Sequence, residues 1–378
     1  MTGTHVQPGH GRLEDRRNNF TAVRLMLAGV VLASHVLMIP HGQPAPGGLH
    51  AALDTMSQFA LDGFFILSGY MLAASLARSS DMTGFAIARV LRIFPGIIAA
   101  ALVVVFGLGL AFTSLGSADY LSAPETWAAL AKLITQADPL TGLPGVFETH
   151  PRGEANTPLW TIRYELMCYA AAGLLAGLGA WRSRVGFWAV TLLALTASVG
   201  FQTVDYNGPL DDTLYAGARF GAAFMIGAAF FRYRDRIPLT WPWIVVEIGL
   251  AVVLKDTPAG PVMAQFATAF VVLGLGFLVL PGGSGRVVRG LPDISYGVYI
   301  LHWPIGQAAY ALNPEISPLA LLAIMAIGAV GAGAVMRLCV EKPALAAKPH
   351  LRAWIAGHSQ RQPRRRTTRV DPALASSS

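Results

Sequence analysis

The sequence predicts an all-α fold, a polytopic membrane bundle of about ten transmembrane helices with both termini in the cytoplasm. Hydrophobic residues make up 54% of the 378 residues, and charged residues only 13%. Soluble domains carry about 25% charged residues, so this composition excludes an ordinary soluble protein. The mean hydropathy of +0.51 points the same way. The other two supporting observations are a series of apolar segments and the distribution of basic residues between them.

Ten apolar segments have lengths suited to the hydrocarbon core of a bilayer, which takes about 20 helical residues at about 1.5 Å each. The third is overlong and has Pro95 near its start, so we expect it to begin as an amphipathic or kinked segment. The loop at 114–157 is either a lid over an outer cavity or a connector. The predicted spans are residues 21–39, 58–77, 86–113, 158–179, 184–202, 213–231, 241–256, 263–280, 292–311 and 317–340.

Basic residues gather at alternate ends of these segments. Loops on one side hold arginines or lysines at every crossing, from Arg12 to Lys342, whereas the alternate loops hold few. Cytoplasmic loops carry such an excess, which places both termini inside. The chain then divides into a cytoplasmic arm at 1–19, a membrane domain at 20–345 and a basic, disordered cytoplasmic tail at 346–378 that can touch anionic lipids. The same asymmetry explains the net charge of +7 without a nucleic-acid partner.

The two cysteines indicate neither a disulfide nor a metal site. Cys168 and Cys339 both lie inside apolar segments, where cysteine behaves as a small hydrophobic residue. We therefore expect no bound metal.

The first span carries two ionisable residues, Arg24 and His35. They are 11 residues apart, roughly three helical turns, so both project from one face. An ionisable group inside a span is costly and needs a partner, a wet cavity or a route to the interface. Arg24 lies near the cytoplasm, where it either snorkels or binds a ligand. His35, about one turn from the outer end, is either a satisfied bundle histidine or a catalytic base.

Glu165 is predicted to lie at a similar depth to His35. The fourth span enters from the outside near Pro158, which places Glu165 about 10 Å below the outer surface. A carboxylate beside an imidazole orients its tautomer and raises its basicity, as a general base requires. We therefore predict His35 and Glu165 as a catalytic pair.

Arg89 and Arg92 stand three residues apart at the start of the third span, on one helical face. They are either positive-inside anchors or a guanidinium clamp for phosphate, such as the diphosphate of a nucleotide-bearing donor. Glu341, at the cytoplasmic end of the last span, is predicted to pair with one of them.

Four further residues are candidates with open alternatives. Asp62 is an interfacial carboxylate or part of a site, and Ser68 bonds its own helix or bridges to a neighbour. Tyr296 is an interfacial aromatic residue, and either Tyr296 or Ser68 is a hydrogen-bond donor to an oxyanion. His302 lies deeper than an interfacial anchor would.

Six short pieces, in order along about residues 20–343, make the chain resemble the acyltransferase-3 family of integral membrane acyltransferases. Each piece alone is weak, but six in family order on a chain of ten predicted spans are specific. The pieces are Arg24 followed by His35, DGFFILSGY at 62–70, RVLR at 89–92 with Pro95, PLWTIRYE at 158–165, ISYGVYILHWP at 294–304 and EKP at 341–343.

The resemblance implies an enzyme that moves an acyl group, often acetyl, from cytoplasmic acyl-CoA to a hydroxyl of a lipid-linked or exported glycan. Arg24 and His35 match the family's first-helix pair, and Arg89 with Arg92 matches its RxxR motif. Glu165 matches the glutamate of its W-S-x-x-x-E stretch, although Thr161 replaces the serine. The bacterial cytoplasmic (inner) membrane is the implied location.

Other functions stay open from the sequence. Intramembrane His and Arg also fit a proton-coupled transporter, which would move a substrate without consuming a thioester. Within the enzyme class, the alternative acceptor is a small hydrophobic molecule such as an antibiotic. Some relatives carry an extra extracytoplasmic hydrolase-like domain after the last span. We expect none here, which argues against a two-domain peptidoglycan O-acetyltransferase.

Overall fold

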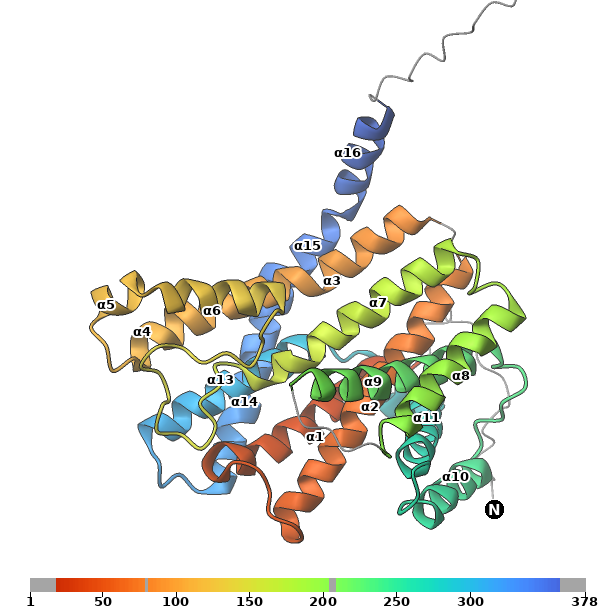
Figure 1. Ribbon diagram of the computed structural model, residues 1–378, viewed down its shortest axis with the longest axis horizontal. Coiled ribbons are helices and arrows are strands. Elements are labelled where there is room, and N and C mark those ends of the chain that lie inside the picture. Colours follow the sequence, from red (N-terminus) through yellow and green to blue (C-terminus); the bar gives the residue numbers. More distant parts are fainter. Residues whose placement is uncertain (1–17, 79–80, 204–208, 361–378) are drawn as a thin grey trace, which may run out of the picture.

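The computed structural model describes residues 18–78, 81–203 and 209–360, and this part of the chain is helical without any strand (Figure 1). Short 3-10 or π-helical segments, labelled η, adjoin some of the α-helices. The elements are α1 Phe20–His41, α2 Gly48–Arg78, α3 Met82–Leu102, η1 Val103–Leu108, α4 Gly109–Phe112, α5 Ser117–Ser122, α6 Pro124–Thr135, η2 Thr157–Thr161, α7 Ile162–Gly177, α8 Arg184–Gly200, α9 Pro209–Arg232, α10 Trp241–Val253, α11 Gly260–Phe277, α12 Gly282–Arg289, α13 Ser295–Leu312, α14 Pro318–Met336, η3 Arg337–Glu341, α15 Lys342–Ala346 and α16 Lys348–Gln360.

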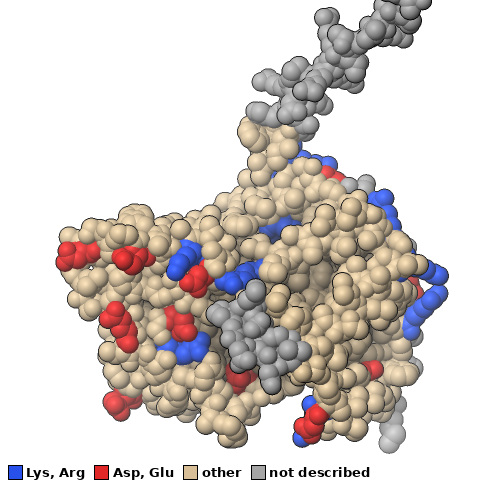
Figure 2. Space-filling model, viewed as in Figure 1, with Lys and Arg blue, Asp and Glu red and all other residues tan. Residues whose placement is uncertain are grey.

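Each of the ten predicted spans is helical, and the all-α membrane bundle is confirmed at that level. Six continuous helical stretches of the described residues are long and apolar enough to cross a bilayer, and α8 and α10 are apolar but shorter. Many large apolar side chains are exposed, and Figure 2 shows a surface on which charges are sparse. Such a surface is typical of a protein that faces lipid. The number of ten spans and the cytoplasmic termini stay predictions.

The overlong third segment is one continuous helical stretch, Met82–Phe112, with an irregular second half. Asp81 caps its start by accepting a hydrogen bond from the Gly84 backbone N–H at 2.9 Å. Pro95 lies inside α3, and the π-helical η1 interrupts the regular pattern at Val103–Leu108. The expected irregularity is therefore present, and η1 adds a second position that the sequence did not indicate.

The C-terminal part differs from the disordered tail expected from residue 346. Lys348–Gln360 form α16, which packs beside α3 (Figure 1). Arg352 of α16 makes an ion pair of 2.7 Å with Asp81 at the start of α3. The basic residues that suggested disorder therefore belong to a helix through residue 360, whose first part contacts α3. The predictions for residues 1–17 and 361–378 lie outside the described residues.

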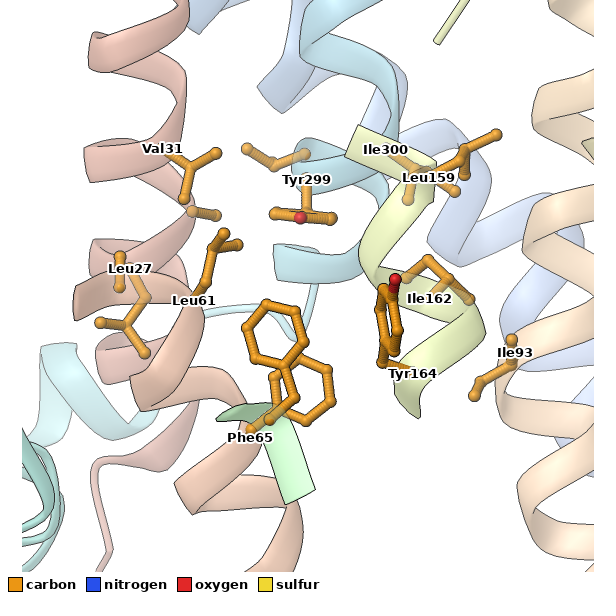
Figure 3. Close-up of a cluster of buried hydrophobic side chains, with 14 of the residues drawn as sticks. Leu27, Val31, Leu61, Phe65, Ile93, Leu159, Ile162, Tyr164, Tyr299 and Ile300 are labelled. Carbon is orange, nitrogen blue, oxygen red and sulfur yellow. The ribbon is translucent and has the colours of Figure 1, made fainter. Parts of the chain in front are cut away.

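Buried apolar side chains of several helices form the core between α1, α2, η2, α7 and α13. Figure 3 shows Leu27 and Val31 of α1 and Leu61 and Phe65 of α2 on one side, and Leu159 and Ile162 on the other. Tyr299 of α13 lies between these two groups in the same view. The core thus brings the helices that carry the predicted site residues against one another.

Two glycines allow α2 and α9 to touch backbone to backbone. A Cβ atom on Gly69 of α2 would lie 1.9 Å from the Phe224 carbonyl oxygen, and one on Gly227 of α9 would lie 1.9 Å from the Ile66 carbonyl oxygen. Small residues of this kind are what close helix approach in membranes requires. The crossing holds α9 against the helix that carries Ser68.

Gly69→Ala and Gly227→Ala are each expected to destabilise the protein by about 1–3 kcal/mol, because an added methyl forces the two backbones apart. Thermal unfolding of the purified protein in detergent measures this. Gly221→Ala is the matched control, since a Cβ at this position of α9 meets nothing within 4 Å. Equal melting temperatures for all three variants would contradict the close crossing.

Candidate active site

His35 and His302 form a buried hydrogen-bonded pair between α1 and α13. The Nδ1 atom of His35 lies 2.7 Å from the Nε2 atom of His302, and the two rings stack with centroids 5.0 Å apart. Only 7% of His35 and none of His302 is exposed. The pair places two of the predicted candidates in direct contact.

The hydrogen bonds of His302 determine the tautomer of His35. The Nδ1 atom of His302 lies 3.1 Å from the Val298 carbonyl oxygen, which can only accept, so this Nδ1 carries the proton. The Nε2 atom of a neutral His302 is then an acceptor, and His35 donates to it from Nδ1. The Nε2 atom of His35 keeps its lone pair and makes no hydrogen bond with a described residue. A histidine in this state can accept a proton.

The segment before η2 fixes α13 around this pair. Pro304 has no backbone N–H, which leaves the Ile300 carbonyl without its usual helical donor, and the Asn156 side-chain amide donates to that carbonyl at 2.8 Å. The Trp303 indole N–H donates to the Glu154 carbonyl at 3.1 Å, and its ring packs edge-on against His35 at 4.9 Å. The end of the 114–157 loop is therefore anchored on α13.

Glu165 is not the partner of His35. Its carboxylate accepts hydrogen bonds from the hydroxyls of Ser68, at 3.3 Å, and Tyr169, and no hydrogen bond joins it to His35. The predicted contact between Glu165 and His35 is therefore wrong, and His302 is the hydrogen-bond partner of His35. Shared depth in two helices does not bring side chains together, because it leaves open which way each helix face points.

Glu165 instead lines a cavity of about 310 Å³ that also contains the three predicted arginines. The cavity walls come from α1, α2, α3, α7, α13 and the start of α16. Its polar lining includes Arg24, Ser68, Arg89, Arg92, Glu165, Tyr169, Asp293, Tyr296, Tyr299 and Lys348.

Two of these arginines are held by carboxylates. Asp293, just before α13, binds Arg24 at 3.2 Å through one oxygen and Arg92 at 3.3 Å through the other. Arg92 also pairs with Glu341 at 3.3 Å, as predicted, and Arg337 shares that carboxylate at 3.0 Å. This network ties α1, α3, α13 and η3 together at one end of the cavity. Arg24 does not simply snorkel to an interface.

Arg89 differs from its neighbours because no ion pair joins it to a described carboxylate. Its guanidinium packs over the rings of Tyr169, at 5.4 Å, and Phe85, at 5.9 Å. Its Nε atom is buried without a hydrogen-bond partner. An arginine that lines a cavity and is not neutralised by a carboxylate is suited to bind an anion.

Tyr299 lies between the cavity and the histidine pair. It lines the cavity, its ring contacts the His302 ring at 6.2 Å between centroids, and its hydroxyl lies 2.8 Å from the Thr161 hydroxyl. Tyr296, one turn earlier, also lines the cavity but donates to the Ile93 carbonyl at 3.0 Å. The predicted use of Tyr296 as a free donor is therefore less well supported than a structural role.

Asp62 lies outside the cavity in a separate polar cluster. It is buried, and its two oxygens pair with the Nε and Nη2 atoms of Arg219 at 3.1 and 3.2 Å. Gln265 donates to Asp62 at 3.2 Å, and Gln58 accepts from Arg219 at 2.6 Å. The cluster joins α2, α9 and α11, so the carboxylate is a buried ion-pair partner rather than an interfacial group.

Several residues of these networks were not among the candidates predicted from the sequence. Arg219 lies inside the predicted span 213–231, and the rule that marked Arg24 would also have marked it. Asp293 precedes a span and resembles an ordinary loop carboxylate in the sequence. Lys348 and Arg352 were absorbed into the predicted tail.

Arg219→Met is expected to cost about 3–5 kcal/mol of unfolding free energy, because it leaves the Asp62 carboxylate buried without its cation. Adding Asp62→Asn should recover part of this loss, which denaturant unfolding in detergent micelles would show. If the double variant is no more stable than Arg219→Met, the pair does not hold the three helices together.

Comparisons with known proteins agree with the resemblance. A protein named O-acetyl transferase from Shigella phage Sf6 is 24% identical over 77% of this chain and 85% of its own length. Nodulation protein 10 from Rhizobium leguminosarum bv. viciae is 28% identical over 89% of this chain and 96% of its own length. No solved structure matches. Residues 17–337 match the sequence profile described as an acyltransferase domain. The chain belongs to the acyltransferase-3 family.

Proposed function

We propose that the protein is a membrane O-acyltransferase that moves an acyl group, most simply acetyl, from cytoplasmic acyl-CoA to a hydroxyl of a cell-surface or exported glycan of the exopolysaccharide or lipopolysaccharide type. The main support is one arrangement. The arginine-lined cavity reaches Tyr299, which contacts the buried His35–His302 pair. Such a path suits a donor with an anionic end and a reactive acyl end.

The donor end of the proposed reaction lies at the arginines. Arg89 has no ion-pair partner among the described carboxylates and binds the phosphates of acyl-CoA, while Arg92 and Arg24 are held nearby by Asp293. The pantetheine arm enters the cavity, whose walls include the apolar side chains of Leu61 and Phe65. The thioester then lies toward Tyr299.

The acceptor end lies at His35. Its Nε2 atom takes the proton from the acceptor hydroxyl, and the hydroxyl oxygen attacks the thioester carbonyl carbon. The carbon–sulfur bond breaks and the proton passes to the departing coenzyme A thiolate, so the products are an ester and free thiol. Direct transfer and transient acylation of Nε2 both need the tautomer that His302 imposes. His302 is thus a positioning residue and His35 the base.

Membership of an acyltransferase family favours an enzyme over a proton-coupled carrier. The relative named O-acetyl transferase supports acetyl as the group and oxygen as the acceptor atom. A small hydrophobic acceptor, such as an antibiotic, is the alternative to a glycan. A flux assay in sealed vesicles tests the carrier, which would move substrate without consuming a thioester.

Purified wild-type protein in nanodiscs is expected to bind acetyl-CoA and hydrolyse it slowly. His35→Ala should bind it but lose about 10²–10⁴-fold in turnover, since the base is gone. Arg89→Gln should weaken binding about ten-fold or more, the effect of one charge-assisted hydrogen bond. Arg286→Gln on the exposed face of α12 is the matched control. A folded, fully active His35→Ala would exclude this mechanism.

His302→Ala is expected to lower turnover about 10–100-fold with little change in acetyl-CoA binding, because the second histidine orients the base and does not touch the donor. His302→Gln keeps an acceptor oxygen for His35 and should recover part of the rate. Turnover and binding are measured on the same nanodisc samples. If both substitutions lower activity equally, the tautomer argument fails.

A further inference from the structure

We propose that a basic cleft beside the cavity binds the 3′-phosphate of coenzyme A, which would make the enzyme selective for acyl-CoA over acyl donors that carry a single phosphate. This proposal rests on the proposed function. The cleft has a volume of about 200 Å³ and lies between α3 and the start of α16. Its charged lining consists of Arg89, Lys348, Arg352 and Asp81.

The cleft adjoins the cavity, and the two spaces share lining residues. Arg89 and Lys348 line both spaces. A donor that reaches Arg89 with its diphosphate therefore has a second polar space directly beside it. Coenzyme A carries a further phosphate beyond its diphosphate, on the ribose, so the order of the two sites along the protein matches the order of phosphates along the molecule.

The charge of the cleft fits a phosphomonoester. Three cations, Arg89, Lys348 and Arg352, face one carboxylate, Asp81, which leaves an excess of two positive charges. A phosphomonoester carries about −1.5 to −2 near neutral pH, whereas the phosphodiester of a common lipid carries one negative charge. The cleft therefore complements the ribose 3′-phosphate more closely than a lipid phosphodiester.

Two of the three cations in the cleft are not neutralised by a described carboxylate. Lys348 makes no hydrogen bond or ion pair with a described residue, and the buried Nε of Arg89 has no partner. Arg352 is held at 2.7 Å by Asp81, which also caps α3. The carboxylate thus orients the third cation at the edge of the cleft.

Two of the three cations come from α16, which begins after the last residue that matches the family profile, 337. The family match therefore does not account for Lys348 and Arg352. Their position follows from the docking of α16 against α3 (Figure 1).

The test compares the binding of acetyl-CoA with that of acetyl-3′-dephospho-CoA to the full chain in nanodiscs, by calorimetry. Wild type is expected to bind acetyl-CoA about ten-fold or more tightly, the effect of a charge-assisted contact. The double variant Lys348→Gln/Arg352→Gln should bind the two acyl donors with almost equal affinity, because only its affinity for acetyl-CoA falls. The control is the double variant Lys342→Gln/Arg286→Gln, which removes the same charge outside the cleft. It should keep the wild-type ratio of the affinities for the two acyl donors.

Asp81→Asn gives an independent check, since asparagine also caps a helix but removes the carboxylate that competes with phosphate. This substitution should increase the affinity for acetyl-CoA more than the affinity for acetyl-3′-dephospho-CoA. Melting temperatures of all variants confirm that they are folded.

Three other results would each contradict a different part of the proposal. If wild type binds both donors equally, the 3′-phosphate site is wrong while the proposed function stands. If wild type binds neither donor, the acyl-CoA donor itself is wrong, and the subsite with it. If the preference exists in neutral-lipid discs and vanishes with phosphatidylglycerol, a lipid headgroup occupies the cleft instead.

Discussion

The requirement that a buried charge be compensated determines which helices meet in this bundle. Asp62 of α2 pairs with Arg219 of α9, and Arg92 of α3 pairs with Glu341 of η3. Leaving one member of such a pair alone costs several kcal/mol, whereas contacts among leucine, valine and alanine can be exchanged at little cost. The polar pairs therefore select one arrangement among many that apolar faces would allow. The backbone contact at Gly69 fits within that arrangement.

Charged or polar groups that lack such a partner therefore point to functional sites. Most charged side chains inside the described bundle have a partner, but Arg89, Lys348 and the Nε2 atom of His35 do not. Arg89 and Lys348 line both the basic cleft and the cavity, and Tyr299 of the cavity wall contacts His302, the partner of His35. Groups left without a partner at a cavity are candidates for binding and catalysis, since an ion pair would already have satisfied them.

The helical segments, the common face of Arg24 and His35, and an ion pair of Glu341 with Arg89 or Arg92 could be predicted from the sequence. Periodicity and length carry that information because they are local. The partner of His35 was predicted wrongly, as Glu165 instead of His302, because depth along a helix is local but the direction of its face depends on packing. Arg219 could have been marked by its place inside a span. Asp293 and the docking of α16 depend on the folded bundle.

Helix α13 connects the two ends of the proposed reaction. Asp293, next to its start, holds Arg24 and Arg92, and His302, two turns into it, holds His35. Pro304 frees a carbonyl that Asn156 satisfies, so the helix is also clamped by the preceding loop. One element thus sets the separation between His35 and the two arginines that are proposed to bind phosphate. In the proposed transfer, that separation must match the distance between the donor's diphosphate and its thioester, which makes the position of α13 the main determinant of catalytic geometry.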